Sequence, residues 1–342
     1  MLGRNEDFLE VANIVTDLLG SGENVIRKFP AFLHPLVAFF STRPLRYQIQ
    51  RCTKIMTPEI ESRKATLART ATEPEHKCKA PNDFLVQSAV ANQPLIETQP
   101  QILATRLAMV NFAANHSSTI TATQAILEIC STDPARKYAE LLRAESLRAL
   151  IDGDGKWTKE AVGRLTCIDS AIRESQRMSS FDMHVGGRII TAAEGLTLPN
   201  GMVLPRGSEV ESPLHSIHFD EGIYLKPYQY DPLRFSRSPS IHDPPSDHPS
   251  CEGDLGDPSK VRPLSIVNAS PDFLAFGHGR HACPGRHFAA SVLKLLLASL
   301  VLRYEVKPFE FRPSNVELGE TLLPHTKIQV LVRRRSDLDG VR

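Results

Sequence analysis

Apolar side chains recur at helical spacing through most of this chain. In residues 5–20, Phe8, Val11 and Val15 fall on one face, which is typical of an amphipathic helix that ends near Gly20. Other segments with helical spacing are residues 44–70, with an interruption expected at Pro58, and residues 101–131, 134–149, 158–177 and 288–302. The pattern therefore predicts that helices form most of the structure.

A smaller part of the chain alternates apolar and polar residues, as strands do. Residues 185–191 and 197–210 read as short strands joined by turns that contain glycine and proline. Residues 303–307 and 327–333 read as a hairpin, with residues 319–323 at its turn. The predicted fold class is mainly α with a small β region (α+β).

Two segments depart from both periodicities. Residues 29–40 are very apolar and are broken by Pro30 and Pro35. They are either ordinary core or a lip that touches a bilayer surface or admits hydrophobic substrates. Residues 236–263 are rich in Pro, Asp, Ser and His without periodicity, which predicts a surface insertion.

Size and composition narrow the classes of protein. The 342 residues are enough for a sizeable core, and the net charge of +1 gives no reason to expect a nucleic-acid partner. The six cysteines lack the spacing of a disulfide framework, so free thiols are expected. The most apolar runs, residues 31–40 and 292–302, are too short to cross a membrane.

One cysteine, Cys283, lies in a glycine-rich loop immediately ahead of an apolar helix. Arg280, His281 and Arg286 flank it, and nearby positive charge together with a helix N-terminus favours the thiolate. A thiolate is one of the few axial ligands that proteins offer to haem iron.

Two other interpretations of this cysteine are open. A buried cysteine in a loop can simply act as a small hydrophobic residue. Alternatively, His278, His281, Cys283 and His287 could form a zinc cluster, although zinc binding would not explain the three glycines and the phenylalanine.

The loop resembles the haem-binding signature of the cytochrome P450 family, Phe-Gly-x-Gly-x-His/Arg-x-Cys-x-Gly. Its positions are filled by Phe276, Gly277, Gly279, His281, Cys283 and Gly285. The resemblance implies that Cys283 is the axial ligand of the iron of haem b, and that Phe276 and His281 belong to the cofactor site.

A second motif is Glu174 and Arg177, three residues apart on a predicted helix. Alone, such a pair is a solvated ion pair that contributes little. In the family that the loop resembles, a Glu-x-x-Arg pair at this place forms a buried network with a later arginine. The resemblance assigns that third member to Arg234, in a segment similar to the family's Pro-x-Arg-Phe.

A third motif lies in the middle of the long helix predicted over residues 101–131. The family's proton-delivery sequence, Ala/Gly-Gly-x-Asp/Glu-Thr-Thr, corresponds here to Ala113, Ala114, His116 and Ser117. The resemblance implies that His116 and Ser117 manage protons, since histidine titrates near neutrality and serine keeps a hydroxyl. The alternative is a histidine that only hydrogen-bonds its neighbours.

The resemblance also suggests residues around the cofactor and the substrate. Arg188 matches a position where the family often places an arginine on a haem propionate, although a solvent-exposed arginine at a strand edge is the other interpretation. Residues 180–184 and 319–323 would line the substrate pocket.

Taken as a whole, the resemblance covers nearly the entire chain and begins near helix F of the family. It implies a single partial domain over residues 1–342, lacking the N-terminal anchor, the first strands and helices A to E. The implied activity is a haem-thiolate monooxygenase that inserts one atom of O2 into a hydrophobic small molecule, in fungal specialised metabolism.

The same resemblance implies partners and a location. Electrons would come from NADPH through NADPH-cytochrome P450 reductase, and peripheral membrane contact is an option. Full-length members lie at the cytosolic face of the endoplasmic reticulum, whereas this chain as given would be cytosolic. The competing hypothesis is a truncated, catalytically inactive remnant without haem.

Overall fold

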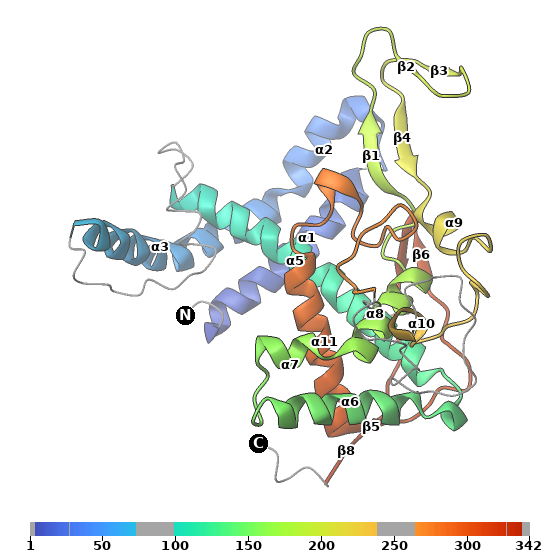
Figure 1. Cartoon of the computed structure of the whole chain (residues 1–342). Coiled ribbons are helices and arrows are strands. Elements are labelled where there is room, and N and C mark those ends of the chain that lie inside the picture. Colours follow the sequence, from blue (N-terminus) through green and yellow to red (C-terminus); the bar gives the residue numbers. More distant parts are fainter. Residues whose placement is uncertain (1–3, 27, 73–98, 238–263, 326, 337–342) are drawn as a thin grey trace. The chain divides into compact units, whose positions relative to one another are not determined.

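The computed structural model describes residues 4–26, 28–72, 99–237, 264–325 and 327–336 (Figure 1). The chain divides into two compact units, residues 1–116 and residues 117–342. The insertion predicted over residues 236–263 lies outside the described residues from position 238 onward.

The described residues of the first unit form helices. They are α1 (Glu6–Ile26), the short 3-10 helix η2 (Ala31–Leu33), α2 (His34–Ser41), α3 (Arg43–Thr72) and the first half of α5 (Pro100–Cys130). The predicted apolar face of α1 is buried: Val11 and Val15 pack in one cluster with Met56 of α3 and Leu103 of α5.

Two expected helix boundaries in this unit are wrong. Helix α1 continues through Gly20 to Ile26, and α3 continues through Pro58. Proline removes one backbone hydrogen bond, but Met56 and Ile60, on either side of Pro58, are 0% and 2% exposed in the apolar cluster. Packing on both sides of the proline offsets the lost bond, and the helix is preserved.

The second unit holds the larger apolar core. Around it lie the second half of α5, η4 (Pro134–Arg136), α6 (Tyr138–Asp152), α7 (Lys159–Gly163), α8 (Thr166–Met178), α9 (Leu214–His218), α10 (Arg234–Arg237), η5 (Gly279–His281) and α11 (Arg286–Arg303). Leu142 of α6, Ile168 of α8 and Leu297 of α11 meet in this core. Every residue of α8 from Cys167 to Arg177 is buried.

The single helix predicted over residues 158–177 is in fact two helices, α7 and α8. The carboxylate of Glu145, on α6, accepts hydrogen bonds from the backbone N–H groups of Cys167 at 2.7 Å and Ile168 at 3.0 Å. These are the free donors of a new helix N-terminus, so a side chain from another helix stabilises the start of α8.

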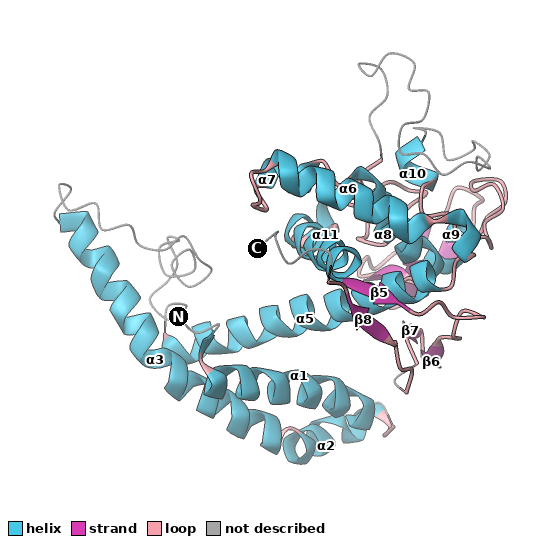
Figure 2. Cartoon of the chain, turned by 90° about the horizontal axis from the view of Figure 1, so that it is seen from below, coloured by secondary structure: helices cyan, strands magenta, loops and turns pink. Residues whose placement is uncertain are grey.

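Within the described residues the strands form four antiparallel pairs; Figure 2 colours the strands magenta and labels β5 to β8. They are β1 (Val185–Ile189) with β4 (Glu209–Ser212), β2 (Leu196–Thr197) with β3 (Val203–Leu204), β5 (Tyr304–Val306) with β8 (Val332–Arg334), and β6 (Val316–Leu318) with β7 (Thr321–Leu323). The prediction of a mainly α fold with a small β region is confirmed.

The cysteines only partly follow the expectation of free thiols. Cys52, Cys130 and Cys283 are free, whereas Cys167, fully buried at the start of α8, is disulfide-bonded. Within the described ranges, no helix combines the length and the apolar character needed to cross a bilayer.

Candidate functional site

The loop that carries Cys283 is held by its own backbone. The N–H of Cys283 donates to the carbonyl of Phe276 at 2.7 Å, and the N–H of Gly277 donates to the carbonyl of Leu274 at 2.7 Å. Gly277 and Gly279 have φ angles of 66° and 67°, a region that costs other residues about 1–2 kcal/mol. The glycines of the motif therefore serve the geometry of the loop.

The thiol of Cys283 lies two residues before Gly285, the N-cap of α11, and is half-buried. Arg286 donates from Nη1 to the carbonyl of Cys283 at 2.9 Å, which places a guanidinium next to the cysteine. Phe276 is half-buried and packs against the core of the second unit. The loop thus has a positively charged side chain, Arg286, beside the cysteine and an apolar side chain, Phe276, packed against the core.

The residues present fit a haem group. Cys283 supplies one free, soft sulfur ligand, the donor that a thiolate-ligated iron requires. A Cβ built on Gly285 would have the sulfur of Cys283 within 4.0 Å, and a Cβ built on Gly279 would meet nothing within 4 Å. The protein backbone therefore does not crowd these parts of the loop, and a flat ligand can approach them.

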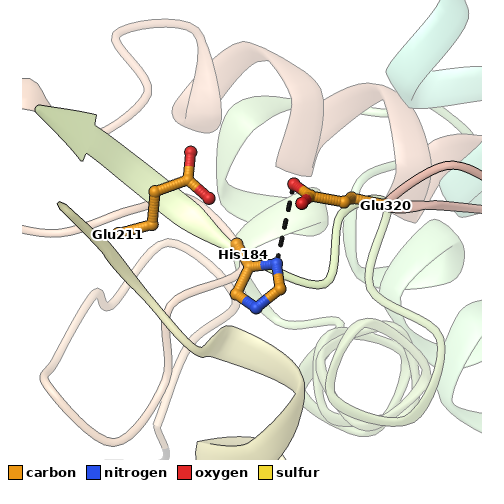
Figure 3. A group of neighbouring side chains, drawn as sticks. All are labelled: His184, Glu211 and Glu320. Atoms are coloured by element: carbon orange, nitrogen blue, oxygen red, sulfur yellow. Dashed lines mark ion pairs between the residues drawn. The ribbon is translucent and has the colours of Figure 1, made fainter. Parts of the chain in front are cut away.

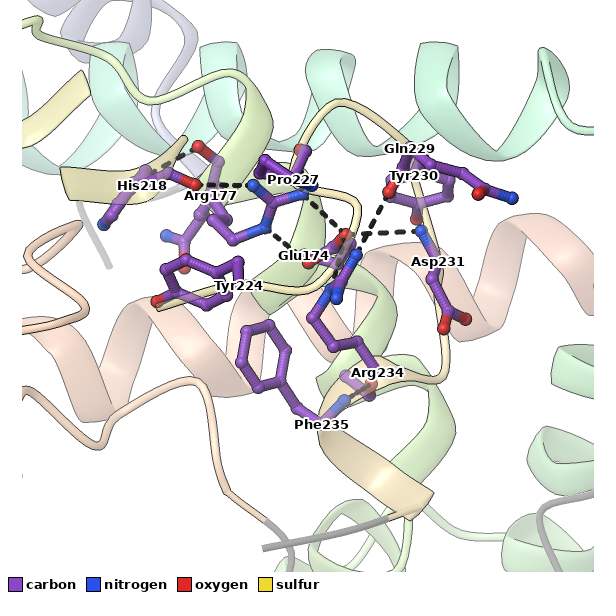
Figure 4. Close-up of polar contacts among 12 residues, drawn as sticks. Glu174, Arg177, His218, Tyr224, Pro227, Gln229, Tyr230, Asp231, Arg234 and Phe235 are labelled. Atoms are coloured by element: carbon purple, nitrogen blue, oxygen red, sulfur yellow. Dashed lines mark hydrogen bonds and ion pairs between the residues drawn. The ribbon is translucent and has the colours of Figure 1, made fainter. Parts of the chain in front are cut away.

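The structure brings Glu174, Arg177 and Arg234 together (Figure 4). Glu174 accepts from Nε and Nη2 of Arg177, both at 2.9 Å, and from Nε of Arg234 at 3.0 Å. The two guanidiniums also donate to backbone carbonyls, among them those of Pro227 at 2.7 Å and Leu225 at 2.9 Å. All three side chains are at most 7% exposed.

Arg177 and Arg234 offset the cost of burying the Glu174 carboxylate. Burial disfavours the ionised form of Glu174, but the adjacent Arg177 and Arg234 outweigh it and hold the pKa of that carboxyl below its ordinary value. The carboxylate is therefore ionised at neutral pH. It ties α8 to the segment that leads into α10.

His218, at the end of α9, is a buried residue of the site that sequence reasoning missed. Its Nε2 accepts from the N–H of Leu274 at 3.0 Å, and its Nδ1 lies 3.1 Å from the hydroxyl of Ser180. Its own carbonyl accepts from Arg177 at 2.6 Å. Burial and the charge of Arg177 lower the pKa of His218 to about 3, so the ring is neutral. No local spacing marks this histidine.

Arg173, one turn before Arg177 on α8, was also missed. It is 2% exposed, and its guanidinium lies over the ring of Phe273 at 3.9 Å. It donates to the carbonyls of Asn268, at 2.9 Å, and Ser265. Burial lowers the pKa of Arg173 to about 10. Arg173 thus anchors the segment just before the cysteine loop to α8.

The remaining predicted site residues are exposed or half-buried. His116, the last residue of the first unit, is exposed and stacks on Phe112 at 5.4 Å, and Ser117, which begins the second unit, is half-buried. Helix α5 is unbroken through both positions. Arg188, on β1, is exposed and donates to the carbonyl of Gly187 at 2.7 Å. His281 is exposed, with its Nε2 3.0 Å from Nε of Arg280.

The two segments expected to line a pocket lie side by side. The N–H of Met183 donates to the carbonyl of Glu320 at 2.8 Å, and the N–H of Leu322 donates to the carbonyl of Phe181 at 2.8 Å. Next to them, Arg312 binds the buried carboxylate of Glu128 on α5 at 2.5 Å. Chain segments far apart in sequence are thus joined by backbone and ionic contacts.

The loop histidines do not form a metal cluster with Cys283. Within the described residues, the one group of three or more His, Cys, Asp or Glu side chains with ligand atoms within 4.8 Å of one another is His184, Glu211 and Glu320. The interpretation of the cysteine loop as a zinc cluster is therefore not supported.

The sequence of this chain matches a known protein family and several curated proteins. The model of the family described as cytochrome P450 matches residues 4–332. Among curated proteins, the chain is 31% identical over 342 residues to the cytochrome P450 monooxygenase gloP of Glarea lozoyensis, with 97% of this chain and 61% of gloP covered. It is 34% identical over 310 residues to htyF of Aspergillus rugulosus, with 89% of this chain and 44% of htyF covered.

The chain spans less than two thirds of the length of these relatives. Among solved structures, a crystal structure of a cytochrome P450, CYP102L1, matches with a TM-score of 0.56 and 18% identity. The match covers 87% of this chain and 60% of that structure, and at this identity it supports the fold alone.

Proposed function

This chain belongs to the cytochrome P450 family, and on that premise we propose that it is the thiolate-bearing part of a haem monooxygenase acting on hydrophobic small molecules. The observation that carries the proposal is the loop of Cys283, a free cysteine with its N–H bonded to the carbonyl of Phe276 and its neighbouring glycines at positive φ. When bound, the haem supplies activation of dioxygen with two electrons.

The residues of the loop hold the cofactor in this proposal. Cys283 provides the sulfur ligand, and Phe276 supports the loop from the apolar core. The exposed positive side chain of Arg188, together with His281, is suited to the carboxylates of a haem. The network of Glu174, Arg177 and Arg234 positions the loop indirectly, through His218.

Proton movement is assigned to His116 and Ser117. The imidazole of His116 is exposed, and its ring nitrogens can accept or donate a proton. Ser117 follows it on the same helix with a hydroxyl that can donate and accept hydrogen bonds.

The substrate and the electron source follow from the relatives. The matching proteins from Glarea, Aspergillus and Penicillium are named monooxygenases, and we infer a hydrophobic product of fungal specialised metabolism as the substrate. Electrons would come from NADPH by way of NADPH-cytochrome P450 reductase. Arg280, exposed near Cys283, supplies positive charge on that side.

A peripheral contact with the cytosolic face of the endoplasmic reticulum membrane is part of the proposal. In the first unit, Phe32, Leu36, Phe39 and Phe40 are 56–80% exposed. Arg46, which lies over the ring of Phe39 at 5.0 Å, brings positive charge to this apolar surface. Exposed aromatic residues next to cations suit a lipid interface, so the lip interpretation of residues 29–40 is preferred to ordinary core.

The test is a reduced carbon monoxide difference spectrum of the purified chain, expressed with a haem precursor. We expect the Soret position of a thiolate-ligated haem, its loss in Cys283→Ser, and its retention in Cys130→Ser, which alters another free cysteine. Failure of the chain to take up haem would favour the inactive remnant, an alternative that the comparisons do not support.

A further inference from the structure

Three side chains with metal-binding chemistry converge at some distance in sequence from the cysteine loop (Figure 3). They are His184, just before β1, Glu211 on β4, and Glu320 in the turn between β6 and β7. One ligand atom from each lies within 4.8 Å of the other two, and Nδ1 of His184 is 3.6 Å from Oε2 of Glu320. All three side chains are exposed.

Hydrogen-bonded backbone brings the three residues together. The N–H of Met183 donates to the carbonyl of Glu320 at 2.8 Å, and Asp182 forms an antiparallel bridge with Thr321. Val185 pairs with Ser212, which places Glu211 next to the strand that follows His184. Backbone pairing therefore places the three residues on neighbouring segments of the chain.

A glycine makes room for one of the carboxylates. A Cβ at Gly187 would lie 2.8 Å from Oε1 of Glu211, closer than real Cβ atoms approach such an oxygen. The missing side chain lets the carboxylate of Glu211 lie against β1. Any larger residue at position 187 would displace that oxygen from its present place.

Among the residues that the structure describes, no Lys or Arg forms an ion pair with Glu211 or Glu320. In the part of the chain that the structure describes, His184 is the one basic side chain that pairs with Glu320, and Glu211 has no ion pair. A cation bound here would balance the negative charge of the carboxylates of Glu211 and Glu320.

We propose that His184, Glu211 and Glu320 bind one zinc ion, with water completing the coordination. An imidazole nitrogen with carboxylate oxygens is a zinc-type donor set, whereas calcium and magnesium prefer oxygen ligands alone. Zinc–ligand distances of about 2.0–2.2 Å require the exposed side chains to close on the ion from their present separation. The bound ion would join the β1–β4 pair to the β6–β7 turn.

The proposal does not rest on haem binding, because none of the three residues belongs to the cysteine loop. The test is calorimetric titration of zinc into the full chain, purified with a tag that contains no histidine. A Cys283→Ser background removes the competing thiol of the loop. One zinc ion per chain is expected, and excess calcium should not displace it.

Variants identify the ligands. His184→Ala, Glu211→Gln and Glu320→Gln should each weaken zinc binding at least tenfold. His325→Ala and Glu317→Gln change exposed residues of the same types near the β6–β7 turn, and should leave the affinity unchanged. Circular dichroism of each variant checks that the fold is retained.

A second readout is thermal stability. Zinc that binds only the folded chain should raise the Tm as its concentration exceeds the Kd, and this rise should vanish in His184→Ala. Unchanged zinc affinity in His184→Ala, or displacement of zinc by calcium, would overturn the proposal. Zinc binding by a chain that takes up no haem would leave this inference standing and remove the monooxygenase proposal.

Discussion

The backbone N–H of Leu274 donates to Nε2 of His218 at 3.0 Å. Through this bond the chain that leads into the Cys283 loop is tied to the end of α9, whose last carbonyl in turn accepts from Arg177. The bond requires an unprotonated Nε2, because a charged imidazole carries a proton on both nitrogens. A neutral histidine thus links the buried ion network to the cysteine loop.

This link predicts a pH dependence of stability. Since the folded pKa of His218 is about 3 and an unfolded histidine has a pKa of about 6.5, the unfolded chain binds the proton more readily. The stabilisation is fully present above pH 6.5 and is lost as pH falls towards 3. Between pH 7 and pH 5 the free energy of unfolding should drop by roughly 2 kcal/mol from this residue.

Urea unfolding of the wild type and of His218→Gln at pH 7 and at pH 5 measures this contribution of His218 to the free energy of unfolding. The variant has no titrating group at the position, so its drop should be smaller by that amount. An equal drop in the two proteins would contradict the assignment, whatever the absolute stability of the variant.

Breaking the Glu174 network should be costly. Glu174→Gln leaves the buried guanidiniums of Arg177 and Arg234 without their carboxylate, and we expect a loss of about 3–5 kcal/mol in the free energy of unfolding. Arg164→Ala is the matched control, because its 2.6 Å pair with Asp152 is exposed. That change should cost less than about 1 kcal/mol. Similar losses in the two variants would contradict the prediction that the buried network stabilises the fold more than an exposed ion pair does.

Arg312 should hold a buried carboxylate in its ionised form. Burial raises the pKa of Glu128, and the contact with Arg312 opposes this rise. In Arg312→Met the pKa of Glu128 should rise further, so the folded chain binds a proton more readily than the unfolded one. The variant's stability deficit should then shrink as the pH is lowered below neutrality.

Chemical unfolding across pH tests this, with the double variant Glu128→Gln/Arg312→Met as the control. In the double variant no carboxylate remains to be protonated, and the deficit should not depend on pH in the same way. A constant deficit in the single variant would contradict the role assigned to Arg312.

The glycines of the cysteine loop should differ in their tolerance of alanine. Gly277 has a φ of 66°, so Gly277→Ala should cost about 1–2 kcal/mol through backbone strain. Gly285 has a φ of −84°, and a Cβ there meets only the sulfur of Cys283 at 4.0 Å. Gly285→Ala should therefore change the free energy of unfolding by less than about 0.5 kcal/mol. Denaturation midpoints of the two variants decide the comparison.

Residues that lie close together in the sequence allowed much of this protein's structure to be predicted. The spacing of glycines around Cys283 and the Glu-x-x-Arg of α8 identified the cysteine loop and two members of the network. Periodicity located α1, α5 and α11 and the strands β1 and β5, since both signals depend on residues a few positions apart. It missed the β6–β7 pair, because residues 319–323, expected only at the turn of a longer hairpin, contain β7. That one domain spans residues 1–342 stays a prediction.

Tertiary structure decided the rest, because it acts between residues far apart in the chain. Glu145 starts α8 from another helix, and burial of Met56 and Ile60 carries α3 through Pro58. His218 and Arg173 matter because both side chains are buried. Their hydrogen-bond partners lie at least 38 residues away in the sequence. Sequence alone named Cys283, whereas packing determined which buried groups hold its loop in place.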